Sequence, residues 1–160
     1  MINQFKGIYV FLSNFFYFSN GIWYDNIYYP TVEHFFQAMK TLVREERIAI
    51  SEAMTPAIAK WMASPNGYKG FKIVLRPDWE DIKIPVMAFG LRVKFSAPLM
   101  QKMLIDTYPH NLVEGNYWND KFWGFCLKTN KGENNLGKLH MVARERLING
   151  LPLDAPDLVF

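Results

Sequence analysis

Helix start signals recur along the chain, and they limit the folds that it can adopt. Thr31 precedes the apolar segment VEHFFQAMK, Thr55 is followed directly by Pro56, and Ser96 and Pro98 precede LMQKMLIDT. A threonine or serine side chain caps the free backbone amides of a first helical turn, and proline fits the first helical position. These positions therefore predict the starts of three helices.

Further segments have the pattern of helices. Residues 44–54 are mixed in charge and helical in pattern, and the leucines and the alanine of residues 135–148 line one helical face. The tryptophan-containing segment 76–95 is also helical in pattern, and we expect Pro85 to break or restart it because proline lacks the backbone donor. The chain is therefore expected to be mainly helical.

Short strands are expected near the N-terminus. In GIWYDNIYYP, Asp25 and Asn26 separate two aromatic runs, which is a signal for a β-hairpin. LVEGNYW and FWGF indicate short extended or irregular segments, and the proline-rich tail 151–160 indicates an irregular strip. No repeat, low-complexity tract or linker interrupts the chain. We therefore expect an α+β fold, predominantly α-helical, in a single domain over residues 1–160.

The composition is that of a protein with a hydrophobic core of ordinary size. The chain has 160 residues, half of them apolar and 16% aromatic, which is enough to bury a core without disulfides or metal. The single cysteine, Cys126, indicates a small buried residue and a reducing compartment. The three histidines lack the spacing of metal ligands. We therefore expect no metal and no cofactor.

The charge and hydropathy of the chain exclude some classes of partner. A net charge of +3 is too small to predict tight, sequence-indifferent binding of nucleic acid, although it would not repel a phosphorylated substrate. Residues 7–24 carry no charge, but serines, asparagines and glycines interrupt them, whereas a spanning helix needs about 20 mostly apolar residues. The first residues also lack the pattern of a signal peptide. We expect a cytoplasmic protein without a membrane partner, and the sequence leaves its oligomeric state open.

Three polar residues stand out on the predicted helix that follows Thr31. At about 100° per residue, Glu33, Gln37 and Lys40 fall on one stripe. Glu33 lies in the first turn, where free amides and the helix dipole keep a carboxylate ionised. The stripe is a candidate catalytic surface. A solvated helix face is the alternative, and the pattern alone favours it.

Two later segments also carry candidate residues. LVEGNYWNDKFWGF combines Glu114 and Asp120 with tryptophans, a combination that suits a flat base and a cationic sugar, and an aromatic core with surface acids explains it equally well. In KGENNLGK, Asn134 and two glycines could bring backbone amides close to a phosphate at the start of the last helix. An ordinary helix start is the favoured reading of that segment.

Taken together, the segments resemble one family, the YbiA-like or NADAR domain, named for a proposed link to NAD and ADP-ribose. The resemblance rests on FLSNFF, YPTVEHFFQAMK, Trp79 with VMAFGLRVKF, LVE, DKFWG and GENNLGKLHMVAR, in the order and spacing of the family. It implies a mostly helical, single-domain N-glycosidase. Family members act on ribosylamine intermediates of riboflavin synthesis or remove ADP-ribose from guanine bases.

The resemblance also implies which residues form the site. The family's polar signature falls on Asn14, Glu33, Gln37, Lys40, Trp79, Lys94, Glu114, Asp120, Trp123, Asn134 and Arg144.

Roles follow from the chemistry of C–N bond cleavage. We expect Glu33 to stabilise positive charge on the sugar and Asp120 to position water. Lys40, with Lys94 in reserve, is the candidate for a Schiff base, and Lys94 is equally readable as a phosphate contact. The two signature tryptophans are expected to stack on the base. The remaining residues are expected to bind substrate, with Asn14, Asn134 and Arg144 holding ribose or phosphate oxygens.

The expected function is hydrolysis of the N-ribosyl bond of an ADP-ribosylated base or of a ribosylamino-pyrimidine phosphate. The expected partner is a nucleotide or ADP-ribosyl substrate, with ADP-ribosylated DNA among the options. The alternative is a non-catalytic module that binds NAD or ADP-ribose. Two positions depart from the family: His140, expected to be a partly buried neutral histidine, replaces an apolar residue, and Tyr108 replaces a glycine in the loop before LVE.

Overall fold

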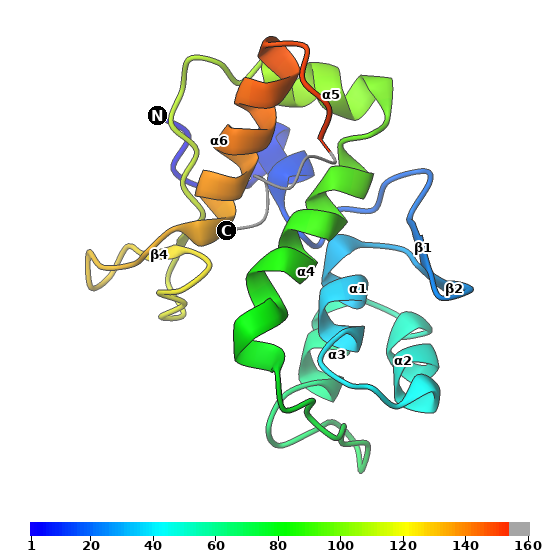
Figure 1. The fold of residues 1–160 in the computed structure, drawn as a ribbon. Helices are drawn as coiled ribbons and strands as arrows, with labels where there is room; N and C mark the ends of the chain where they lie inside the picture. The colour runs from blue at the N-terminus through cyan, green and yellow to red at the C-terminus, as the bar shows by residue number, and fades with distance from the viewer. Residues whose placement is uncertain (154–160) are drawn as a thin grey trace. The chain divides into compact units, whose positions relative to one another are not determined.

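The computed structural model describes residues 1–153 and is built mainly from α-helices, as predicted (Figure 1). In chain order the elements are η1 (Gly7–Leu12), β1 (Ile22–Tyr24), β2 (Ile27–Tyr29), α1 (Val32–Ala38), α2 (Arg44–Ser51), α3 (Pro56–Met62), α4 (Trp79–Lys94), α5 (Pro98–Ile105), β3 (Gly115–Asn116), β4 (Phe125–Cys126) and α6 (Asn135–Ile148). None of the helices within residues 1–153 is both long and apolar enough to cross a membrane.

The chain divides into two compact units, which we describe separately. One unit comprises residues 14–94, and the other comprises residues 1–13 together with the described residues from Phe95 onward. The single domain expected over residues 1–160 stays a prediction. Of the tail that was expected to form an irregular strip, residues 154–160 lie outside the described part of the chain.

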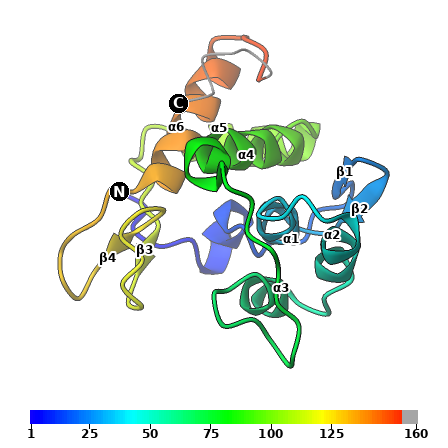
Figure 2. The ribbon, with the colours of Figure 1, turned by 60° about the horizontal axis from the view of Figure 1, so that its bottom comes forward.

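Helix α1 is the centre of the unit formed by residues 14–94. It contacts α2, α3, α4 and β2 (Figure 2). Every one of its seven residues is buried. Its close approach to α4 leaves little room at Gly90, where a Cβ would lie 3.1 Å from a side-chain carbon of Val32 and 3.4 Å from one of Phe35. A helix covered on all sides is usually apolar throughout. The polar residues of α1 are therefore held inside the unit.

The predicted helix starts and the predicted hairpin are confirmed in this unit. The hydroxyl groups of Thr31 and Thr55 each accept a hydrogen bond from the backbone amide three residues later, at 3.2 Å in both cases. Strands β1 and β2 pair antiparallel around Asp25 and Asn26, whose φ angles of 52° and 57° are left-handed. Asp and Asn tolerate this conformation, which the tightest hairpin turns require.

The prediction that Pro85 interrupts its helix is wrong. Helix α4 runs without a break from Trp79 to Lys94 and contains Pro85. Proline removes one backbone donor from the helix. The residues that follow it, Met87, Ala88 and Leu91, are buried. Their packing offsets the loss of one hydrogen bond, so the helix continues.

In the other unit, α5 packs against α6, and β3 pairs with β4 in parallel. Pro98 occupies the first turn of α5 as predicted, but Ala97 and not Ser96 is the N-cap. His140 was expected to be partly buried and is fully buried, with its Nδ1 2.7 Å from the carbonyl oxygen of Leu136. Its ring also contacts that of Phe95. The histidine thus substitutes for an apolar residue within the core of this unit.

Candidate active site

The candidate residues divide between the two units. Six of them lie within residues 14–94, namely Asn14, Glu33, Gln37, Lys40, Trp79 and Lys94, and five lie in the other unit, namely Glu114, Asp120, Trp123, Asn134 and Arg144.

Glu33 and Gln37 form a buried polar pair on α1. Their residues are 5% and 3% exposed, and Gln37 Nε2 donates a hydrogen bond to Glu33 Oε1 at 2.7 Å. The backbone amide of Glu33 donates to the carbonyl oxygen of Asn14 at 3.0 Å. The alternative of a solvated helix face is therefore wrong for these two residues. The structure instead holds a carboxylate inside the unit.

Two buried amide oxygens lie on the residues that touch Glu33. The Oε1 atom of Gln37 and the Oδ1 atom of Asn14 have no hydrogen-bond partner among the described residues. The other amide atom of Asn14, Nδ2, contacts the sulfur of Met87 on α4 at 3.4 Å. Buried acceptors usually find partners. The roles of Asn14 and Gln37 in substrate binding stay predictions.

Lys40 lies just beyond α1, because the helix ends at Ala38. The predicted helical row therefore ends in a turn, in which the backbone amide of Lys40 donates to Gln37 at 3.2 Å. Its Nζ atom lies 5.8 Å from the ring centre of Phe36 and 6.0 Å from that of Trp79. Burial lowers the pKa of Lys40, opposed by the charge of Glu33. The amine thus lies in an aromatic, partly dry environment near the carboxylate.

Trp79 is the first residue of α4 and is buried. Its ring meets that of Phe36 edge-on, with the ring centres 5.0 Å apart. Packing of this kind stabilises a core. The stacking of Trp79 on a base stays a prediction, whereas its contact with the amine of Lys40 is a property of the structure.

Lys94 is the last residue of α4 and is completely buried. Its Nζ atom lies 5.7 Å from the ring centre of Phe16, and burial lowers the pKa of Lys94 to about 7. A lysine with such a pKa has a substantial neutral fraction at pH 7, and the neutral amine is the nucleophilic form. Lys94 therefore has the lowered pKa that a Schiff-base lysine requires, the role for which it is the reserve candidate.

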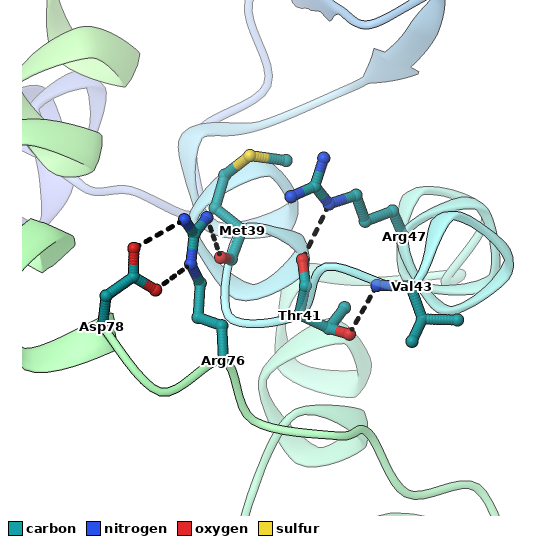
Figure 3. Close-up of polar contacts among 6 residues, drawn as sticks. All are labelled: Met39, Thr41, Val43, Arg47, Arg76 and Asp78. Carbon is teal, nitrogen blue, oxygen red and sulfur yellow. Dashed lines mark hydrogen bonds and ion pairs between the residues drawn. The ribbon is translucent and has the colours of Figure 1, made fainter.

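Sequence patterns missed a group of residues that fixes the end of α1 (Figure 3). Arg47 Nε donates to the carbonyl oxygen of Thr41 at 2.8 Å, and the hydroxyl of Thr41 accepts from the amide of Val43 at 3.0 Å. Arg76 forms a forked ion pair with Asp78. The only sequence signal for this group is the arginine and aspartate of RPDW, directly before Trp79.

In the other unit, Asp120 shapes the loop that carries Trp123. Its Oδ1 atom accepts from the backbone amides of Phe122 at 3.1 Å and Trp123 at 3.0 Å. The side chain of buried Asn116 donates a hydrogen bond to the carbonyl oxygen of Asp120 at 2.7 Å and accepts one from its backbone amide at 3.1 Å. Sequence analysis missed Asn116. The carboxylate of Asp120 thus has a structural partner, and its role toward water stays a prediction.

Asn134 fixes backbone in the same unit and does not cap α6 with its side chain. Its Oδ1 atom accepts from the amide of Glu114 at 3.0 Å, and its Nδ2 atom donates to the carbonyl oxygen of Leu112 at 2.9 Å. A Cβ at Gly137 would lie 2.3 Å from that carbonyl. Close packing of α6 on this segment explains Gly137, and the phosphate contact suggested for Asn134 stays a prediction.

Arg144 holds the loop in which Tyr108 replaces the family's glycine. One guanidinium nitrogen donates to the hydroxyl of Thr107 and to the carbonyl oxygen of His110, both at 2.8 Å. The guanidinium also lies 5.7 Å from the ring centre of Tyr108, and burial lowers the pKa of Arg144. Tyr108, the residue that departs from the family pattern, therefore lies against the guanidinium of Arg144.

No group of three metal-ligating side chains occurs within residues 1–153, and Cys126 is buried there as a free cysteine. Residues 3–148 match the NADAR domain. The chain belongs to the NADAR domain family. This confirms the resemblance, and the match covers both units.

Named relatives of this NADAR protein include N-glycosidases. It is 37% identical over 124 residues to N-glycosidase YbiA of Escherichia coli, covering 77% of this chain and 73% of that protein. It is 34% identical over 135 residues to an N-glycosidase of Nostoc punctiforme, covering 84% of each. The match to the maize riboflavin biosynthesis protein PYRR, at 34% identity, covers 82% of this chain but 22% of the maize protein.

The fold is also similar to a solved structure. The NMR structure of the Escherichia coli protein YbiA superposes with a TM-score of 0.75 at 34% sequence identity, covering 94% of this chain and 88% of that one.

Proposed function

We propose that this NADAR protein is an N-glycosidase that hydrolyses an N-ribosyl bond. The observation that carries the proposal is the buried carboxylate of Glu33, fixed by Gln37 and close enough to Lys40 for its charge to act on the amine. A binding module has no need of an acid and an amine held together inside the protein. The names of two relatives, both N-glycosidases, support the same reaction class.

Glu33 serves as the charge stabiliser. Breaking the bond between C1′ and the base nitrogen leaves positive charge on C1′ and the ring oxygen, while the base departs with the bonding electrons. A carboxylate that is already fixed and largely dry stabilises that charge without reorganising at the moment of reaction. The hydrogen bond from Gln37 supplies the fixation.

Lys40 provides a covalent route for the same reaction. Its neutral amine adds to C1′ as the base leaves with a proton, and ring opening gives a Schiff base. Water then hydrolyses the Schiff base, which frees the sugar and restores the amine. Burial of Lys40 increases the neutral fraction of its amine. Lys94, which is more deeply buried, is the reserve for this step.

The proposed substrate is an ADP-ribosylated base, such as ADP-ribosyl-guanine, or a ribosylamino-pyrimidine phosphate. The two classes share the N-ribosyl bond and a phosphate group, and they differ in the leaving base. The second class is supported by the name of the maize relative, a riboflavin biosynthesis protein.

A release assay tests the proposal. Purified protein is incubated in parallel with ADP-ribosylated guanine DNA, with ribosylamino-pyrimidine phosphates and with NAD, and free base and free sugar are measured. We expect both products from one of the first two substrates. Binding of NAD or ADP-ribose without release from any substrate would favour the non-catalytic module and contradict the proposed function.

A further inference from the structure

We propose that Arg76 is a positioning residue: it joins the end of α1 to the start of α4 and thereby places the amine of Lys40 against the ring of Trp79. The placement is a property of the structure, and its catalytic consequence rests on the proposed function. Arg76 lies outside the family signature, and its hydrogen bond to Lys40 joins backbone atoms.

Arg76 makes contacts in both directions (Figure 3). Its Nε and Nη2 atoms donate to the two carboxylate oxygens of Asp78 at 2.7 and 2.9 Å, and Nη1 reaches the carbonyl oxygen of Met39 at 3.5 Å. Its backbone amide donates to the carbonyl oxygen of Lys40 at 2.8 Å. One residue therefore holds the backbone of residues 39–40 and the carboxylate that directly precedes Trp79.

Arg76 also compensates the charge of the carboxylate that precedes Trp79. The guanidinium of Arg76 lowers the pKa of Asp78 and compensates the charge of that carboxylate. The charged groups that act on Lys40 are Glu33 of α1, Lys60 of α3 and Glu80 of α4. On the α2 side, Glu46 and Arg47 are engaged with Thr41.

Loss of Arg76 therefore changes the surroundings of Lys40. Looser packing of Trp79 readmits water to the amine, and water favours the charged form. This effect raises the pKa of Lys40 toward the value of an exposed lysine. A role of Arg76 in stability alone would lower the melting temperature without changing the titration of Lys40 in the folded protein.

The test compares the full chain with Arg76→Gln, Arg76→Lys and Arg44→Gln. Arg44 is the matched control, because it also pairs with an aspartate, Asp25, in the same unit, but on an exposed surface. The titration of Lys40 is followed by NMR after reductive ¹³C-methylation, with Lys40→Arg identifying its signal. Turnover and KM for ribosyl release are measured across the same pH range.

In Arg76→Gln we expect a raised pKa of Lys40 and a fall in kcat on the order of tenfold or more at neutral pH, as a displaced catalytic group gives. The activity should recover at alkaline pH, with KM little changed. Arg76→Lys keeps a cation beside Asp78 and should show a smaller shift, and Arg44→Gln should show none. An unchanged Lys40 titration in folded Arg76→Gln overturns the proposal.

The test still gives an answer if a variant does not fold or if the parent protein is inactive. If Arg76→Gln does not fold, Arg76→Lys decides, because it loses the fork and the contact with Met39, and an unshifted Lys40 titration in it overturns the proposal. If the unmodified protein releases no base from any substrate, the proposed function fails, while the NMR titration still tests the placement of Lys40.

Discussion

Gln37 donates a hydrogen bond of 2.7 Å to Glu33, and both residues are buried on a helix that neighbouring elements cover on every side. A buried carboxylate is costly unless it is hydrogen-bonded. The pairing lowers that cost while leaving Gln37 Oε1 without a partner within residues 1–153. The unit therefore retains a polar group where an apolar pair would pack with less penalty, which is the pattern of a functional site.

Replacement of Glu33 should separate catalysis from binding. We expect Glu33→Gln to lower turnover by about 10² or more while leaving substrate affinity nearly unchanged, because the carboxylate charge acts mainly in the transition state. Steady-state kinetics and equilibrium titration with substrate measure the two quantities. Glu45→Gln, an exposed glutamate of α2, is the control and should behave as the parent protein. A fully active Glu33→Gln protein would refute the catalytic role of Glu33.

A second prediction concerns the covalent route. Borohydride added during turnover should reduce the Schiff base and leave a mass increase on the peptide that contains Lys40. Lys40→Arg should abolish the adduct although it preserves the charge, because arginine stays protonated. Peptide mass spectrometry locates the modification. An adduct on Lys94 in place of Lys40 would transfer the role, and no adduct on either lysine would argue for direct attack by water.

A third prediction follows from the buried amine of Lys94. The pKa of Lys94 is lowered to about 7 in the folded state, from 10.5, so the unfolded chain binds more protons between these values. This group therefore makes the free energy of unfolding rise with pH across that window and fall as the pH drops toward 7. We expect Lys94→Met to be more stable than the parent at neutral pH, with a flatter dependence on pH.

Urea denaturation at pH 7 and at pH 9.5 measures this effect, and Lys60→Met serves as a control because Lys60 is exposed. The difference in stability between Lys94→Met and the parent should shrink at the higher pH. An equal difference in stability at the two pH values would mean that burial does not neutralise Lys94.

Much of the local structure followed from short-range signals. Thr31 and Thr55 start helices, and Asp25 with Asn26 turns a hairpin, because caps and left-handed turn residues act within three or four positions. Pro85 shows where such signals fail, because burial of the residues that follow it keeps α4 continuous.

The candidate site was predictable in identity but not in environment. The spacing of Glu33 and Gln37 predicted a shared face, yet the same pattern suits a solvent face, and only the packing around α1 shows that they are buried. Arg76, which pairs with Asp78, contacts Met39 at the end of α1 from a distant part of the sequence, and no periodicity within α1 indicates it. Contacts between distant segments are what a single sequence conceals.

The last prediction distinguishes two tryptophans that share an expected role. Trp79 is 6% exposed and packs on Phe36, so Trp79→Ala should destabilise the protein by about 3–5 kcal/mol, the usual result of removing a buried aromatic ring. Trp123 is partly exposed, and if it stacks on the base, Trp123→Ala should weaken substrate binding by about 1–3 kcal/mol. Urea denaturation and fluorescence titration measure the two effects, with exposed Trp118→Ala as the control for both. Unchanged affinity in Trp123→Ala would remove Trp123 from the binding site, because a ring that stacks on the base cannot be deleted without loss of affinity.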